Sequence, residues 1–139
     1  MNYEEQAAFD AVMHFLDSYS KRSVEGCMAA LALSRPILLL GTNDNEVFRT
    51  AEDVRASFTR DFSGMTNIRF GQCRTVHVQA AQELASVLVE LPISYVNEGK
   101  DVATLIRYAL TLAKEEGQWK ICAGMASVPF EAGTYSFQQ

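Results

Sequence analysis

Apolar residues in the first half of the chain recur at the spacing of an α-helix. A helix is predicted over residues 3–20, a short one over Val24–Leu31 behind the capping residue Ser23, and a third beginning at Thr50. Asp53 stands where it can complete a capping box with Thr50, and Gly64 suits the end of that third helix. The apolar stripes are Phe9, Val12, Met13 and Leu16 in the first helix, and Val54, Phe58 and Phe62 in the third.

From Thr66 onward the apolar period changes to two, which is typical of half-buried strands. Strands are predicted over 67–79, 84–96, 101–114 and 119–128, with two shorter ones over 37–40 and 46–49 on either side of a polar turn, and Glu131–Gln139 has the composition of a tail. Helices therefore come first and an antiparallel meander last. This order favours an α+β fold, with three N-terminal helices packed on a curved, mainly antiparallel sheet. A length of 139 residues suits one domain over 1–139.

The hairpin turns fix which side chains share a face of this sheet. With turns centred on 81–82, 98–99 and 116–117, Glu90 lies directly opposite Arg107 as a cross-strand ion pair on one face. The other face is more apolar and is expected to meet the helices, and it carries Gln72, Arg74, Val89, Leu91, Ile106, Tyr108, Met125 and Ser127. A single β-bulge would reverse every assignment beyond it.

Charge and cysteine content exclude several classes of function. The net charge is −5 and the 12 basic residues are scattered, which argues against a nucleic-acid or membrane-surface partner. The three cysteines have no metal-ligand spacing, so we expect reduced thiols, no metal site and no cofactor. The polar, acidic N-terminus is not that of a signal peptide, and no apolar run is long enough to span a membrane. We therefore expect a cytoplasmic protein.

Polar side chains that converge on an apolar concave surface are typical of a ligand pocket. The expected ligand-binding residues are Tyr19, Gln72, Arg74, Tyr108, Ser127 and Trp119. Arg74 would favour an anionic or carbonyl-bearing ligand, because a buried guanidinium needs an acceptor. Two alternatives stay open. Arg74 can simply reach the rim while Tyr108 finds a buried partner, and a bulge that inverts the register would bring Glu90 and Arg107 inside as acid–base and oxyanion-stabilising groups.

Three segments carry a resemblance to a known family. They are Leu40-Gly41-Thr42 with the following Glu46–Arg49, Arg107-Tyr108 leading into Leu112, and Gly117–Ile121 running to Ser127-Val128-Pro129. Over about residues 3 to 130 the chain resembles the SnoaL-like branch of the NTF2-like superfamily, a cone-shaped fold that also includes ketosteroid isomerase. The resemblance implies fold more firmly than activity, because this scaffold hosts enzymes, binders and assembly domains.

The chain departs from the catalytic patterns of that superfamily. Ala123 and Met125 stand where relatives often carry histidines in the last strand. Ketosteroid isomerase places an aspartate base after the first short strand, where Gly41 stands here and Asp44 lies beyond, in the turn. Tyr19 matches the tyrosine of its first helix, but the meander holds no mid-strand aspartate to pair with it.

Two main hypotheses of function follow. The first is a homodimer that binds a small hydrophobic carbonyl or carboxylate ligand, and the alternative is a cofactor-free isomerase, cyclase or dehydratase acting on a hydrophobic carbonyl compound. A third and weaker hypothesis is an oligomerisation module. A module of that kind is normally fused to an effector domain. The dimer is expected through the apolar outer face around Leu88, Pro92, Leu105 and Ala109 and from the family's habit of pairing through its sheets. A titratable group facing the cavity would favour the enzyme.

Overall fold

The computed structural model describes residues 1–135, and three helices precede most of the sheet. They are α1 (Tyr3–Ser20), α2 (Val24–Ala29) and α3 (Ala51–Gly64). Asn2 and Glu5 form a capping box at α1, since each side chain accepts from the other's backbone N–H. Thr50 caps α3 by accepting from the backbone N–H of Asp53 at 3.1 Å. The expected positions of all three helices are confirmed, with α2 ending two residues before Leu31.

The strands form one curved, mainly antiparallel sheet, so the α+β architecture is confirmed. Its order is β2-β1-β7-β6-β5-β3, with β4 also paired to β5 and β1 parallel to β7. The strands are β1 (Leu38–Leu40), β2 (Val47–Phe48), β3 (Met65–Phe70), β4 (Thr75–Ala81), β5 (Leu84–Asn97), β6 (Lys100–Glu115) and β7 (Gln118–Ser127). The expected tail extends beyond β7, and its last four positions, 136–139, lie outside the described residues.

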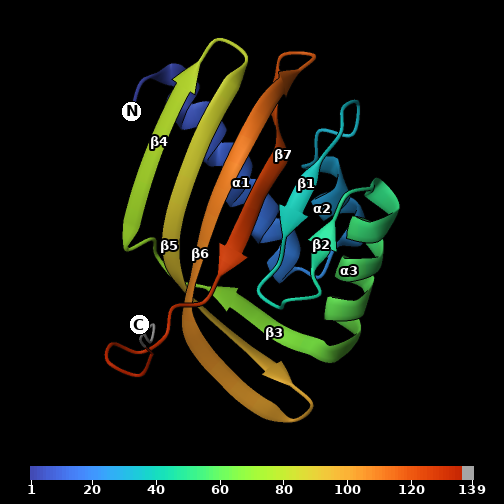
Figure 1. Cartoon of the computed structure of the whole chain (residues 1–139), viewed down its shortest axis with the longest axis vertical. Coiled ribbons are helices and arrows are strands. Elements are labelled where there is room, and N and C mark those ends of the chain that lie inside the picture. Colours follow the sequence, from blue (N-terminus) through green and yellow to red (C-terminus); the bar gives the residue numbers. More distant parts are fainter. Residues whose placement is uncertain (136–139) are drawn as a thin grey trace, which may run out of the picture.

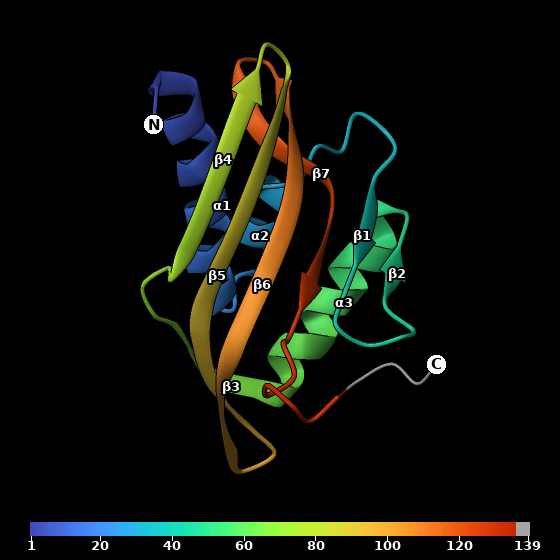
Figure 2. The same cartoon turned by 60° about the vertical axis from the view of Figure 1, so that its left-hand side comes forward.

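The helices cover one face of the sheet and leave the other bare. Helix α1 crosses behind β4, β5, β6 and β7 in Figure 1, and α3 lies beside β1 and β2. Figure 2 shows the sheet bending around this helical layer. Buried side chains from α1, such as Val12 and Leu16, meet Val87, Val89 and Leu91 of β5 in the core. Trp119 opens β7 and is only 6% exposed, which confirms its expected burial.

The register is as predicted between β5 and β6, and between β6 and β7 it is as predicted from the turn as far as the pair Leu112 and Ile121. Glu90 lies opposite Arg107, as expected. Along β7, the pairing shifts by one residue between Thr111 and Leu112 of β6, because Cys122 is an extra residue in β7. Beyond this β-bulge every β7 side chain changes face. Ala126, and not Met125, therefore lies opposite Tyr108, and Ser127 pairs with Arg107 on the outer face.

The expected strand over 67–79 is in fact two strands, and the first hairpin turn is centred on 82–83 rather than 81–82. The positions expected for Gln72 and Arg74 are therefore wrong, and Val76 lies opposite Val89. Residues 71–74 are irregular between β3 and β4, so strict alternation does not reach them. Arg74 donates its backbone N–H to the carbonyl of Glu90, and its Nε lies 3.7 Å from the Glu90 carboxylate. Its exposed guanidinium thus belongs to the outer face rather than to the concave one, and Gln72 is exposed in the same segment.

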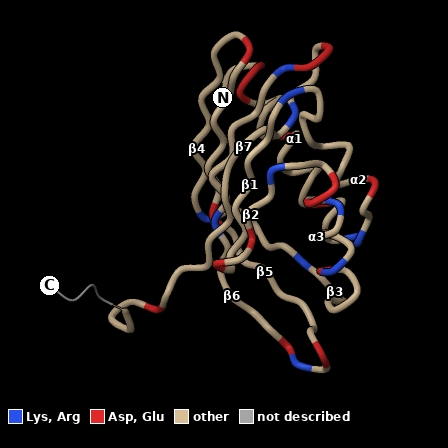
Figure 3. The backbone as a smooth tube through the Cα atoms, turned by 45° about the vertical axis from the view of Figure 1, so that its right-hand side comes forward, with Lys and Arg blue, Asp and Glu red and all other residues tan. Residues whose placement is uncertain are grey.

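Charged residues are spread over the molecule. Figure 3 shows Lys and Arg interspersed with Asp and Glu on the helices and turns, with long uncharged stretches along the strands. Such a distribution offers no clustered basic face for a polyanion. None of the helices within residues 1–135 has the length and apolar character needed to cross a membrane.

Candidate functional site

A cavity lies between the concave face of the sheet, helices α1 and α3, and the β1–β2 hairpin. Its inner chamber has a volume of about 170 Å³ and is walled mainly by aromatic and aliphatic side chains. An apolar cavity of about 150 Å³ holds one benzene molecule, so this chamber has room for a single ring. The apolar walls are formed by Phe15, Leu31, Leu39, Phe48, Val54, Phe58, Ile106, Leu110 and Ile121.

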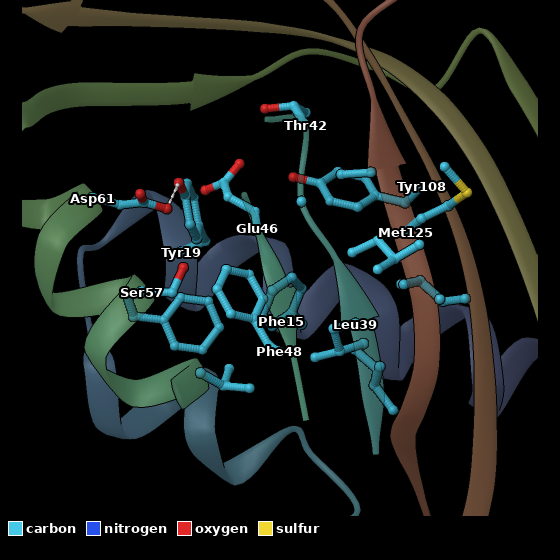
Figure 4. A pocket seen from close by; sticks show the side chains of 18 of the residues that line it. Phe15, Tyr19, Leu39, Thr42, Glu46, Phe48, Ser57, Asp61, Tyr108 and Met125 are labelled. Atoms are coloured by element: carbon cyan, nitrogen blue, oxygen red, sulfur yellow. Dashed lines mark hydrogen bonds between the residues drawn. The ribbon is translucent and has the colours of Figure 1, made fainter. Parts of the chain in front are cut away.

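Polar side chains gather at one end of this apolar chamber. Figure 4 shows Tyr19, Asp61, Glu46, Thr42 and the Tyr108 hydroxyl facing the same space, above the phenylalanine rings. Tyr19 comes from α1, Asp61 from α3 and Tyr108 from β6, and the other two come from the β1–β2 hairpin. Only the folded chain brings them together. An apolar chamber with a few convergent polar groups is the usual form of a small-molecule site.

Asp61 and Tyr19 form the central hydrogen bond of this polar end. The Tyr19 hydroxyl donates to Oδ2 of Asp61 at 2.8 Å. Burial, and to a lesser degree the charge of Glu46, raises the pKa of Asp61, although the bond from Tyr19 and the charge of Arg60 oppose this shift. Burial and the neighbouring Asp61 together raise the pKa of Tyr19. Asp61 is thus a carboxyl group with an increased proton affinity at the edge of an apolar chamber.

Glu46 is held in place by the β1–β2 hairpin. Its Oε1 accepts the backbone N–H of Asn43 at 2.8 Å, and its carbonyl accepts the N–H of Gly41 at 2.9 Å. The Glu46 side chain packs so closely over Gly41 that a Cβ there would lie 2.8 Å from the Cβ of Glu46, an atom with less freedom to move than the carboxylate. A residue without a side chain is therefore needed at position 41, and the loop expected to be only a turn forms one wall of the cavity.

Tyr108 projects from the middle of β6 into the cavity. It is 9% exposed, and its hydroxyl makes no hydrogen bond to any of residues 1–135. Burial raises the pKa of Tyr108, so the phenol stays protonated at neutral pH. The hydroxyl opens onto the cavity, where a ligand oxygen would accept its hydrogen bond.

Two of the expected site residues lie at the cavity and the others do not. Tyr19 and Tyr108 line it, whereas Gln72, Arg74, Ser127 and Trp119 are absent from its walls. Ligand binding by the two tyrosines stays a prediction. The register-inverted alternative is not realised either, because the bulge lies in β7 and leaves the β5–β6 pairing unchanged.

Glu90 and Arg107 form an ion pair on the bare face of the sheet. The Arg107 Nε lies 2.7 Å from the Glu90 carboxylate, whose side chain is 10% exposed. The hydrogen bond from Arg107 lowers the pKa of Glu90, with the charges of Arg107 and Arg74 acting in the same direction. The pair is thus an ionised structural contact placed away from the cavity.

The two cavity carboxyl groups were missed by the sequence analysis. Asp61 had a detectable signal, because Ser57 and Asp61 stand three and seven residues after Val54 and so share its inward helical stripe. Polar residues on an apolar stripe deserve testing as site residues. Glu46 had no such signal, since its position depends on how the hairpin folds against α3.

Histidine and cysteine add nothing to this site. Both histidines, His14 and His77, are exposed, and no group of three or more His, Cys, Asp or Glu residues suited to a metal ion occurs within residues 1–135. Cys27 is buried, and burial together with the charge of Asp61 raises its pKa to about 12. Its thiol is therefore protonated at neutral pH and is a poor nucleophile.

Comparisons with known proteins agree with this architecture. The SnoaL-like domain matches residues 9–131. A proposed dehydratase of the NTF2-like family from Streptomyces avermitilis has a similar structure, with a TM-score of 0.80 and 16% identity over 91% of this chain and 97% of that one. A ketosteroid isomerase-like protein from Erwinia carotovora atroseptica gives 0.79 and 15% identity over 94% and 100%.

A third similar structure is a proposed scytalone dehydratase from Novosphingobium aromaticivorans, with a TM-score of 0.80 and 12% identity over 91% of this chain and 85% of that one. No curated protein matches the sequence. At such identities the structural matches establish the fold and leave the chemistry to the site itself.

Proposed function

Because the chain belongs to the SnoaL-like domain family, we propose that it binds a small hydrophobic carbonyl compound and acts on it as an acid–base isomerase, cyclase or dehydratase. The observation that carries this proposal is Asp61, a carboxyl group with a raised pKa that lines the same apolar chamber as the unpartnered hydroxyl of Tyr108, with Tyr19 and Glu46 between the two in Figure 4. A protein that only bound an apolar ligand would have little use for partly buried carboxyl groups on the cavity wall, since removing them from water is costly.

The geometry suits proton transfer next to a carbonyl group. The substrate carbonyl oxygen accepts the Tyr108 hydroxyl, and the ionised Asp61 removes a proton from the adjacent carbon. The electron pair moves into the carbonyl group, and the resulting enolate oxygen is stabilised by the phenol. In a β,γ-unsaturated ketone the enolate is conjugated with the double bond, so Asp61 returns the proton to the γ-carbon and the double bond moves to the α,β position. In a β-hydroxy ketone Asp61 gives the proton to the hydroxyl, which leaves as water while the α,β double bond forms. Its raised pKa brings the base closer to neutral pH, where general bases are most effective.

The charges around the chamber favour an uncharged ligand. Asp61 and Glu46 both line it, and none of the lining residues of the inner chamber is Lys or Arg. Arg74, on which the expectation of an anionic ligand rested, faces the outside. A ketone or aldehyde is therefore a better candidate than a carboxylate, which two acidic side chains would repel.

We also infer that the protein is a homodimer whose subunits meet through the bare face of the sheet. The cross-strand pairings place Leu88 and Ala109 opposite each other on that face, and the row continues to Met125 and Leu40, which also line the inner chamber at the edge of the sheet. Leu88 is 41% and Met125 is 45% exposed, and apolar rows of this kind usually mark a contact surface. A reducing compartment such as the cytoplasm is the proposed location, because Cys27, Cys73 and Cys122 are all free thiols.

The test is catalysed exchange of protons next to a carbonyl group. Propiophenone, an uncharged ketone with one ring, is incubated with the protein in D₂O, and loss of its α-protons is followed by NMR. We expect exchange above the buffer rate, a loss of about 10²-fold or more in Asp61→Asn, and a smaller loss in Tyr108→Phe. Asp53→Asn is the matched control, since this exposed aspartate lies on the same helix outside the cavity.

The outcomes separate an enzyme from a binder. If propiophenone binds but its α-protons exchange at the buffer rate, the acid–base proposal is wrong and a binding function remains. If exchange occurs equally in the Asp61→Asn protein, the base lies elsewhere.

A further inference from the structure

We propose that the cavity contains a second, outer subsite that binds an uncharged, hydrogen-bonding arm of the same ligand, with the Thr104 hydroxyl as its principal contact. This inference rests on the proposed function. It narrows the substrate class to amphipathic carbonyl compounds, with a ring at one end and a hydroxyl or amide group at the other.

The outer chamber adjoins the inner one at the candidate acid–base groups. It has a volume of about 330 Å³. Both chambers are lined by Tyr19, Thr42, Glu46, Asp61, Ile106 and Tyr108. A carbonyl group held at Tyr108 and Asp61 therefore has an apolar chamber on one side and the outer chamber on the other. A ligand that reacts there can extend into both.

The cavity wall formed by β6 changes from apolar to polar along the strand. Leu110, Tyr108, Ile106 and Thr104 alternate onto the concave face, and Thr104 lies opposite the buried Ile93 of β5. At about 3.4 Å per residue, Thr104 lies roughly 14 Å along the strand from Tyr108. The Thr104 side chain is half-buried, and its hydroxyl makes no hydrogen bond within residues 1–135. It is thus available to a ligand that extends along the strand from the reacting group.

The other walls of the outer chamber also offer hydrogen bonds. Asn43 and Asn97 contribute amide-bearing side chains to its lining, and Arg60 is the only Lys or Arg in the lining of either chamber. Glu46 and Asp61 lie on the same lining, so the single positive charge of Arg60 faces two carboxyl groups. An anionic arm would be repelled by these carboxyl groups, and an apolar arm would leave the polar lining unsatisfied. A neutral hydroxyl or amide is not repelled by the carboxyl groups and can form hydrogen bonds with the polar lining.

The experiment compares two series of probes. Phenyl alkyl ketones with straight arms of five to ten carbons, a range that covers the span from Tyr108 to Thr104, are titrated into the protein, each beside the same ketone with a terminal hydroxyl, and dissociation constants are measured by NMR. We expect the hydroxyl to strengthen binding by about three- to tenfold at one arm length, the effect of one hydrogen bond. Thr104→Val, which keeps the shape and removes the hydroxyl, should abolish that gain and leave the plain ketones unaffected.

Thr111→Val is the matched control, because Thr111 lies on the same strand but its side chain lies on the opposite face. This variant should retain the gain. If the plain ketones bind and no arm length shows a gain, or if the gain survives in Thr104→Val, the outer subsite is overturned while the proposed inner pocket stands. If none of the ketones binds, the proposed function fails and the outer subsite fails with it.

Discussion

The hydrogen bond from Tyr19 to Asp61 has a consequence that can be measured without knowing the substrate. Because the pKa of Asp61 is raised, the folded protein holds this proton more tightly than the unfolded chain does. The contribution of this proton to the free energy of unfolding is complete below about pH 4, which is the ordinary pKa of aspartate. It is lost as the pH rises through the pKa of Asp61 in the folded protein. Tyr19 limits that loss, because its hydroxyl donates to the carboxylate.

Tyr19→Phe should therefore destabilise the protein by an amount that depends on pH. A bond to a neutral carboxyl group contributes about 0.5–1.5 kcal/mol, and a bond to an ionised one contributes about 1.5–3 kcal/mol. The loss of unfolding free energy should thus increase by roughly 1 kcal/mol between acidic and neutral pH. In an Asp61→Asn background, where no proton titrates at this position, Tyr19→Phe should cost about 1 kcal/mol at every pH.

Urea denaturation monitored by far-UV circular dichroism between pH 4 and 8 measures all four proteins of this double-mutant cycle. Tyr3→Phe is a suitable control, since Tyr3 is 84% exposed and should be neutral. The reasoning is refuted if Tyr19→Phe costs the same at both ends of the pH range in the wild-type background. It is also refuted if the cost varies with pH as strongly without the Asp61 carboxyl group as with it.

Two further predictions concern stability and assembly. Trp119→Ala should reduce the unfolding free energy by about 3–5 kcal/mol, because a large buried ring is removed, and a loss below 1 kcal/mol in the same assay would contradict its burial. Leu88→Asp should convert the proposed dimer to a monomer in analytical ultracentrifugation at micromolar concentration, with Tyr3→Phe as the control. A wild-type protein that sediments as a monomer would contradict the dimer itself.

The sequence predicted the fold well where local chemistry is decisive. The β5–β6 register is correct because Glu98 and Gly99 both have positive φ, at 52° and 78°, in the two-residue turn that matches strand twist. Capping residues likewise located the helices at Ser23 and Thr50. In these cases a few adjacent residues determine the geometry, so a single sequence is sufficient.

The sequence was less informative where a distant contact is decisive, and Gly124 shows why. Its φ of 144° and the closeness of the Ala109 carbonyl, 2.3 Å from a Cβ placed at this position, leave little choice but glycine just beyond the β7 bulge. Glycine inside a strand often marks a bulge, and this was the available sign that Met125 and Ser127 would change face. The glycine does not indicate which residue of β7 is the additional one in the bulge, because that depends on how β7 packs beside β1 and β6.

The candidate site combines both situations. Asp61 occupies a position on the inward stripe of α3 where an apolar residue would pack more favourably, so local pattern alone marks it as unusual. What the pattern does not show is its environment, since Tyr19 comes from α1, Glu46 from the hairpin and Tyr108 from β6. A carboxyl group that is retained at a cost in stability, on the same cavity as a hydroxyl with no protein partner, supports the proposal that this site acts on a ligand. The same argument makes α3 and β6 the elements on which to test function, and not the positions of Gln72, Arg74, Ser127 and Trp119, which lie outside the cavity walls.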